Sequence, residues 1–224
     1  MSSPNPDRAS VSEVDAGANL IPTFAASLAA LLVGLVVIFG ATEGGGGFTT
    51  EALRRAEVAR APQPIPDFAL HDGAGSSTAL HQMMGADGKV WIVDFVYTRC
   101  QTICTSLGSI YQQLQRQIIE RGLQDKIGLL SVSFDPVNDD AAALRQYATR
   151  MRLDPDVWRI LTLANVQDRR RLLDAFGIMV VPAPLGEFEH NAALHIVTAD
   201  GRMVEIVDYL VPALALDVAL AWQR

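Results

Sequence analysis

The chain has 224 residues and half of them are hydrophobic, so it is long enough to bury a sizeable core. Its 18 Lys and Arg residues against 25 Asp and Glu residues give a formal charge of −7, and it carries no basic stripe or arginine-rich arm, which excludes nucleic acid as an expected partner. Two cysteines are too few for a disulfide scaffold or a four-cysteine zinc site, but they leave a mixed cysteine and histidine metal site open.

The N-terminal part contains one long uncharged segment. No Asp, Glu, Lys or Arg occurs from Ala16 to Thr42, and the apolar stretch 20–40 would form a helix about 31 Å long, close to the thickness of bilayer hydrocarbon. A buried core helix is disfavoured by the length of the uncharged run, and a cleaved signal peptide is disfavoured by that length and by the acidic leader. We expect an N-terminal leader at 1–19 and an uncleaved transmembrane anchor at 20–40.

The segment after the anchor reads as a linker. Four glycines at 44–47 form a flexible tether, and a short helical pattern at 51–61 ends at the proline-rich "PQPIP". We therefore expect a flexible linker at 41–62 and a folded domain at 63–224. The arginines that follow the anchor weakly favour a cytoplasmic domain, but they begin more than ten residues beyond it and have acidic neighbours.

Strand and helix patterns alternate along the rest of the chain. In order, we predict a short strand and turn in 65–75, a buried strand at 89–98, a helix at 106–122, a buried strand at 127–134, a helix at 139–151, a strand at 158–163, a helix at 166–177, an Asp-Gly hairpin at 194–209 and a closing helix at 211–223. Alternating units predict a parallel sheet covered by helices, and the hairpin makes the sheet mixed. We expect an α/β fold with a thioredoxin-like mixed sheet flanked by helices.

Both cysteines lie where the first long strand gives way to a helix. Three residues separate Cys100 from Cys104, so their side chains can share one face of a helical first turn. The positive end of the helix dipole lowers a thiol's pKa, and the thiolate is both a nucleophile and a metal ligand. Three interpretations remain open: two small core residues, a redox pair, and a soft-metal site. The commonest oxidoreductase motif has only two intervening residues.

A metal held by two thiolates would need a further ligand. Of the four histidines, His71 and His81 fall in an early polar region and read as solvated. His190 and His195 fall beside the first strand of the predicted hairpin, in a part of the chain expected to pass close to the cysteines. Their odd separation sends the two side chains to opposite faces, so at most one should face the site. Thiolate and imidazole together favour copper or zinc.

From about Pro66 to Trp222 the chain resembles the Sco/SenC family of membrane-anchored, copper-binding proteins. The stretch "GKVWIVDFVYTRCQTIC" resembles the family's strand and Cys-x3-Cys turn, "SVSFDPVNDDAAALRQYA" its Asp-Pro segment, and "HNAALHIVTADGR" its histidine segment before an Asp-Gly turn. The resemblance implies that Cys100, Cys104 and His190 bind copper, as Cu(I) or Cu(II). It also places Asp135 near the site, although Asp135 can equally be a turn residue before a proline.

The resemblance implies one main function and one alternative. The main function is a copper chaperone for the dinuclear copper centre of cytochrome c oxidase, with the copper-site subunit of the oxidase and other copper chaperones as partners. The alternative is a thiol-disulfide oxidoreductase that reduces the cysteines of that centre, with Cys100 and Cys104 as its redox-active pair. Gln101 and Thr105 stand where the family has prolines, and Glu189 stands where it has Asp; these departures spare the ligands and leave the two functions open.

The resemblance also bears on the location of the protein and on a third possible activity, that of a peroxidase. We expect a single-pass protein of the inner (cytoplasmic) membrane with its C-terminal domain in the periplasm, since paired thiols suit an oxidising compartment. A peroxidase of the same fold is disfavoured because Tyr97 occupies the position where its motif has Thr.

Overall fold

The computed structural model describes residues 20–41, 50–100, 103–184 and 187–223, with the backbone alone described for residues 20, 41 and 103–106. The chain divides into two compact units, residues 1–53 and 54–224.

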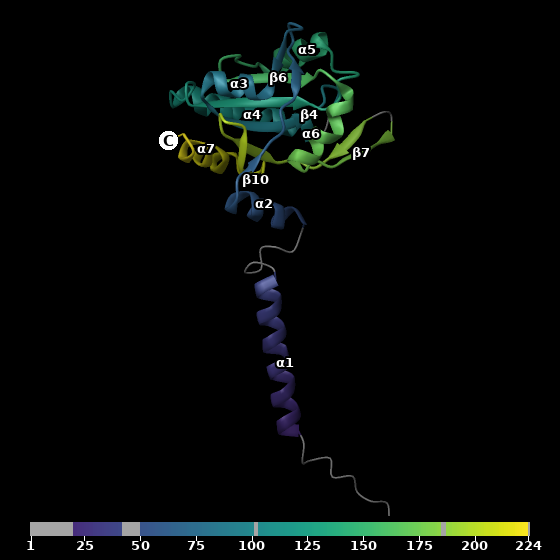
Figure 1. Ribbon diagram of the computed structural model, residues 1–224, viewed down its shortest axis with the longest axis vertical. Coiled ribbons are helices and arrows are strands. Elements are labelled where there is room, and N and C mark those ends of the chain that lie inside the picture. Colours follow the sequence, from purple (N-terminus) through teal and green to yellow (C-terminus); the bar gives the residue numbers. More distant parts are fainter. Residues whose placement is uncertain (1–19, 42–49, 101–102, 185–186, 224) are drawn as a thin grey trace, which may run out of the picture. The chain divides into compact units, whose positions relative to one another are not determined.

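The first unit contains the helix α1 (Leu20–Ala41) (Figure 1). Its stretch Ile21–Gly40 has a mean hydropathy of 2.4, and none of that stretch is buried inside the protein. The helix is therefore not a core helix, and it has the length and composition of a membrane anchor or a signal sequence.

The folded unit begins earlier than the sequence pattern indicates. Helix α2 (Thr50–Arg60) forms where a short helix was expected, and its Val58 is buried in the hydrophobic core. Arg54 also packs its guanidinium group against Gly177. Residues from Arg54 onward thus belong to the compact unit, whereas the domain was expected to start at residue 63.

An eight-stranded mixed sheet forms the centre of the second unit, in the order β1-β10-β9-β4-β5-β6-β2-β3. The strands are β1 (Gln63–Pro64), β2 (Ala69–His71), β3 (Ser77–Ala79), β4 (Val90–Val96), β5 (Ile127–Ser133), β6 (Trp158–Leu163), β9 (Leu194–Val197) and β10 (Arg202–Val207). Strands β4, β5 and β6 are parallel, and β9 lies antiparallel to β4. Every residue of β4 and β5 is buried, which explains why these strands read as continuous apolar runs.

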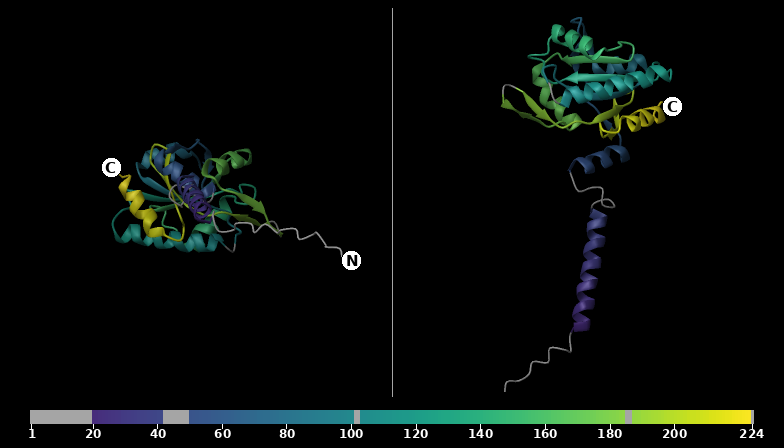
Figure 2. Two further views of the ribbon diagram at one scale, coloured as in Figure 1. Left: turned by 90° about the horizontal axis from the view of Figure 1, so that it is seen from below. Right: turned by 180° about the vertical axis from the view of Figure 1, so that it is seen from behind.

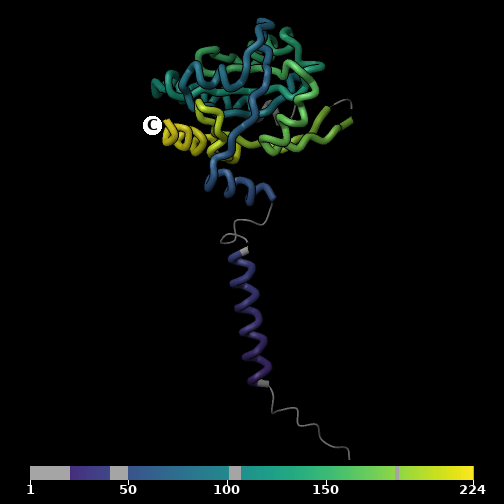
Figure 3. Tube along the Cα trace, in the orientation of Figure 1, coloured from purple at the N-terminus to yellow at the C-terminus, as the bar shows by residue number. Residues whose placement is uncertain are grey.

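Helices cover both faces of the sheet (Figure 2). They are α3 (Leu80–Asp87), α4 (Ile103–Glu120), α5 (Ala141–Met151), α6 (Arg169–Phe176) and α7 (Pro212–Ala221). Helices α4, α5 and α7 lie on one face, where α4 contacts both α5 and α7. Helices α3 and α6 lie on the other face. Asp140 caps α5 by accepting a hydrogen bond from the Ala143 N–H. Figure 3 shows the C-terminal part of the chain, in yellow, returning to the sheet.

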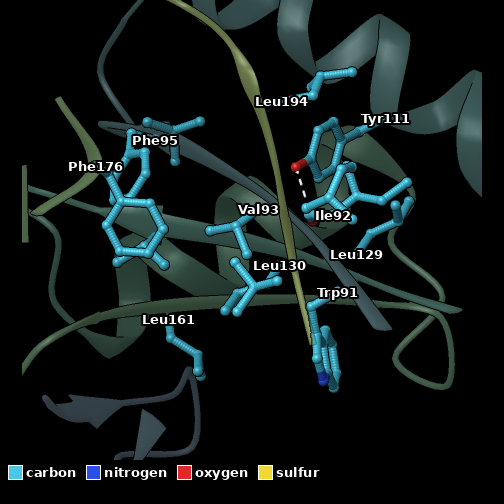
Figure 4. Close-up of a cluster of buried hydrophobic side chains, with 14 of the residues drawn as sticks. Trp91, Ile92, Val93, Phe95, Tyr111, Leu129, Leu130, Leu161, Phe176 and Leu194 are labelled. Atoms are coloured by element: carbon cyan, nitrogen blue, oxygen red, sulfur yellow. Dashed lines mark hydrogen bonds between the residues drawn. The ribbon is translucent and has the colours of Figure 1, made fainter. Parts of the chain in front are cut away.

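Alternation along β4 divides its side chains between the two faces (Figure 4). Phe95 packs against Phe176 of α6, with ring centroids 4.8 Å apart. On the opposite face, the Tyr111 hydroxyl of α4 donates a hydrogen bond to the Ile92 carbonyl, 3.0 Å away. Asp94 lies on this α4 face and is fully buried.

A second, two-stranded sheet was not predicted. Strands β7 (Val180–Pro182) and β8 (Phe188–His190) pair antiparallel outside the main sheet. Because the strands are three residues long and the segment contains two prolines, they produce no strand signal in the sequence.

Candidate metal centre

The turn that follows β4 buries Cys100. The Cys100 N–H donates to the Tyr97 carbonyl at 3.2 Å, which closes the turn at the carboxyl end of the strand. The Cys100 side chain is buried, and only 6% of the residue is exposed. The described turn therefore places one thiol at the edge of the sheet where α/β folds bind their ligands.

Asp139 holds this turn from the segment after β5. Its carboxylate accepts hydrogen bonds from the Thr98 N–H at 2.9 Å, the Thr98 hydroxyl at 2.7 Å and the Ser133 hydroxyl at 2.5 Å. Burial raises the pKa of Asp139, and these hydrogen bonds lower it in part. Arg150 of α5 adds a hydrogen bond to the Thr98 carbonyl at 2.9 Å. Neither Asp139 nor Arg150 was recognised from the sequence.

Asp135 lies beside the same turn, and its side chain is almost fully buried. One carboxylate oxygen is 3.1 Å from the Arg99 guanidinium group, and both oxygens accept hydrogen bonds from the Asn138 amide. Since Arg99 immediately precedes Cys100, Asp135 reaches the cysteine turn through an ion pair.

His190 is the last residue of β8, and it lies near Cys100. The Cys100 charge raises the pKa of His190, whereas burial, the larger effect, lowers it. The His190 ring packs against Phe134 and Tyr97, with centroid separations of 5.3 and 6.4 Å. The chain thus brings two buried side chains, the Cys100 thiol and the His190 imidazole, close enough to interact electrostatically.

The hydrogen bond to His190 indicates which nitrogen is available as a ligand. Nδ1 lies 2.9 Å from the Asn191 carbonyl oxygen. Because a carbonyl oxygen can only accept, Nδ1 carries the proton and Nε2 carries the lone pair. The backbone carbonyl of Asn191 thus fixes the orientation of the His190 ring.

His195 has a different environment. It is fully buried in β9, its two ring nitrogens lie 3.3 and 3.1 Å from the Val93 and Phe176 carbonyl oxygens, and its ring meets the rings of Phe95 and Phe176 edge-on. It packs and hydrogen-bonds within the fold. The reasoning from opposite faces of one strand was wrong, however, because His190 and His195 belong to different sheets.

The second cysteine falls partly outside the description. The backbone of Cys104 lies in the first turn of α4, but its side chain is outside the described residues. Among the side chains that are described, no group of three His, Cys, Asp or Glu forms a metal site. His71 and His81 hydrogen-bond to the Ser77 hydroxyl and the Ile65 carbonyl, in other parts of the domain.

The fold is that of a thioredoxin-like protein, with a buried cysteine in the turn at the edge of its sheet. The chain belongs to the SCO1/SenC family, whose family model matches residues 57–221.

Individual relatives support this assignment. The chain is 26% identical over 143 residues to the SCO1 protein homolog of Bacillus subtilis, which covers 63% of this chain and 72% of that protein. BsSco, described as having a disulfide switch and as a member of the Sco family of cytochrome c oxidase assembly proteins, superposes with a TM-score of 0.62 at 22% identity over 73% of this chain and 95% of its own. ScoI of Bradyrhizobium japonicum with copper bound gives a TM-score of 0.57 at 21% identity over 71% and 99%. These structures confirm the thioredoxin-like fold.

Proposed function

We propose that this chain carries copper as cargo, bound by Cys100, Cys104 and His190, and delivers it to the dinuclear copper centre of cytochrome c oxidase during assembly. The observation that carries the proposal is that the Cys100 thiol and the His190 imidazole are both buried and interact electrostatically, although 90 residues separate them in the chain. The copper-bound ScoI relative supports the choice of metal.

The donor set suits copper. Thiolates prefer Cu(I), and an added imidazole extends the site to Cu(II). The Nε2 lone pair of His190 is the expected third donor, since Nδ1 is engaged with Asn191. Cys104 would supply the second thiolate from the first turn of α4, one turn from Cys100. Asp135 would act from outside the ligand set by fixing Arg99 beside the thiolates, where a positive charge favours the ionised form of the sulfur.

The proposal includes location and partners. In this proposal residues 1–19 are the leader, α1 is the single-pass anchor in the inner membrane, and residues 42–53 connect it to the copper-binding domain, which lies in the periplasm. Copper would come from other copper chaperones and pass to the copper-site subunit of the oxidase. The length and hydropathy of α1 support the anchor, and the family's role in oxidase assembly supports the partner.

The test compares two histidines in the full chain held in detergent. His190→Ala should lose the thiolate-to-Cu(II) charge-transfer absorption, because thiolates unsupported by an imidazole reduce Cu(II) to Cu(I), and two Cu(II) ions take up the two electrons released when one disulfide forms. His195→Ala should keep the absorption and lose stability, since it removes packing and not a ligand. A band that survives in His190→Ala and vanishes in His195→Ala would reverse the ligand assignment.

The alternative function is reduction of the disulfide at the same copper centre of the oxidase. The two cysteines one helical turn apart, and the disulfide switch described for BsSco, favour it. His190→Ala separates the two functions. It should stop Cu(II) transfer but leave thiol-disulfide exchange with the oxidised copper-site subunit intact, because exchange needs only the dithiol.

A further inference from the structure

Tyr97 connects the two halves of the site. It is the first residue after β4, 1% exposed, and it precedes Cys100 by three residues. Its hydroxyl donates a hydrogen bond to the Phe188 carbonyl oxygen and accepts one from the Phe188 N–H, both at 3.1 Å. One side chain from the cysteine-bearing segment is therefore bonded twice to the backbone of β8, two residues before His190.

The pairing of β7 with β8 leaves these two backbone groups for Tyr97. The Ala183 N–H donates to the Glu187 carbonyl across the hairpin, at 2.8 Å. Because hydrogen-bonding directions alternate along an antiparallel strand, the N–H and carbonyl of Phe188 point away from β7. The Tyr97 hydroxyl hydrogen-bonds to both groups and so takes the place of a neighbouring strand.

The rings strengthen the same connection. Phe188 and His190 lie two apart in β8, so their side chains share one face of the strand. Both rings pack on Tyr97, with centroids 5.4 and 6.4 Å away, and Phe134 completes the group at 5.6 Å from Tyr97. The face that presents His190 is thus fixed against the ring of Tyr97.

The hydroxyl also faces the thiol. Burial, and secondarily a hydrogen bond with Cys100, raise the pKa of Tyr97 to about 12. A phenol has one proton and two lone pairs. Its proton goes to the Phe188 carbonyl, and its oxygen accepts from the Phe188 N–H.

We propose that Tyr97 is the positioning residue of the copper site, whose hydroxyl fixes the distance between Cys100 and His190. The inference rests on the proposed function for its metal. The contact between Tyr97 and Phe188 does not depend on the proposed function, so a measurement on the metal-free protein can test it separately.

The experiment uses the full chain in detergent and the variant Tyr97→Phe, which keeps the ring and removes the hydroxyl. Tyr111→Phe is the matched control. It removes another buried hydroxyl bonded to a backbone carbonyl, on the opposite face of β4. Tyr97→Phe should weaken Cu(II) binding roughly 10- to 100-fold and change the charge-transfer absorption, while Cu(I), held by the two thiolates, should bind almost as in the wild type. Tyr111→Phe should leave both copper measurements unchanged.

Hydrogen exchange of the metal-free proteins provides the second readout. The Phe188 amide should exchange faster in Tyr97→Phe than in the wild type and in Tyr111→Phe. Unchanged exchange at Phe188, an unchanged Cu(II) spectrum and affinity in Tyr97→Phe, or equal changes in both variants would overturn the proposal. A wild-type chain that takes up no copper would overturn the proposed function instead, and the exchange result would still decide the role of Tyr97.

Discussion

Asp94 should make the stability of the domain depend on pH. It lies in the middle of β4 with no exposed surface, and neither carboxylate oxygen has a hydrogen-bond partner among the described residues. The nearby Ser131 hydroxyl accepts from the Trp158 indole, and the Tyr111 hydroxyl donates to the Ile92 carbonyl. Burial raises the pKa of Asp94 from 3.8 to about 7, although Ser131 and Tyr111 lower it in part.

The sign of the effect follows from the raised pKa. Below pH 3.8 the carboxyl is protonated in both the folded and the unfolded chain, so it adds no pH dependence there. Between that pH and about 7 the unfolded chain ionises first, and the folded state loses stability as pH rises. At about 1.4 kcal/mol for each pKa unit, the full loss is about 4 kcal/mol above neutral pH.

The perturbation is Asp94→Asn, which keeps the shape of the side chain and cannot ionise. The amide has a burial cost of its own, but that cost does not change with pH, and all other ionisable groups are common to both proteins. We therefore expect the stability of the variant relative to the wild type to rise by roughly 3 kcal/mol between pH 4.5 and pH 8.5.

The assay is urea unfolding of the full chain, followed by tryptophan fluorescence. All three tryptophans, Trp91, Trp158 and Trp222, lie in the unit 54–224, so the signal reports on the folded domain and not on α1. A stability difference between the two proteins that stays constant across this pH range would refute the reasoning.

Three further predictions concern packing, the cysteine turn and topology. Gly128→Ala should lower the unfolding free energy by about 1–3 kcal/mol, because its Cβ would lie 2.5 Å from the buried Trp91 ring; an unchanged urea midpoint would contradict this. Asp139→Ala should lower the unfolding free energy by about 3 kcal/mol, because it leaves the buried donors of Thr98 and Ser133 without an acceptor. Asp140→Ala removes only a helix cap and should lower it by about 1 kcal/mol. Equal losses in the two variants would count against the buried network. A C-terminal reporter enzyme that works only outside the cytoplasm should be active, and activity solely of a cytoplasmic reporter would reverse the proposed topology.

The sequence predicted the central part of the fold well, because the signals there are local. The run 89–98 is rich in apolar residues and contains β4, every residue of which is buried, and the helix predicted at 106–122 covers most of α4. The Asp-Gly turn at 200–201 connects β9 and β10 as expected. The short elements were missed. Helix α3 has little separation of polar and apolar faces, and β7 and β8 are too short to show a period.

The candidate site was predicted only as a set of residue types. Cys100 and His190 could be named from motifs, and the structure places them close together. The residues that hold them there could not be named, since Asp139 acts over 41 positions and Tyr97 over 91. Such contacts depend on the order of strands in the sheet, which local patterns do not encode. In the sequence Tyr97 resembles one more apolar strand residue. The role of its hydroxyl becomes visible only in the structure, where it hydrogen-bonds to the backbone of Phe188 in β8.

The outer edge of β1 has a consequence for association between neighbouring molecules. Ile65 donates its N–H to Gly201, so residues 63 and 65 point inward to β10, and residues 62, 64 and 66 point their backbone nitrogens to the free edge. All three of these residues are prolines, which have no N–H to donate. A strand of another molecule therefore finds no donor along this edge, and edge-to-edge association of neighbouring domains is blocked where the sheet would otherwise be open to it.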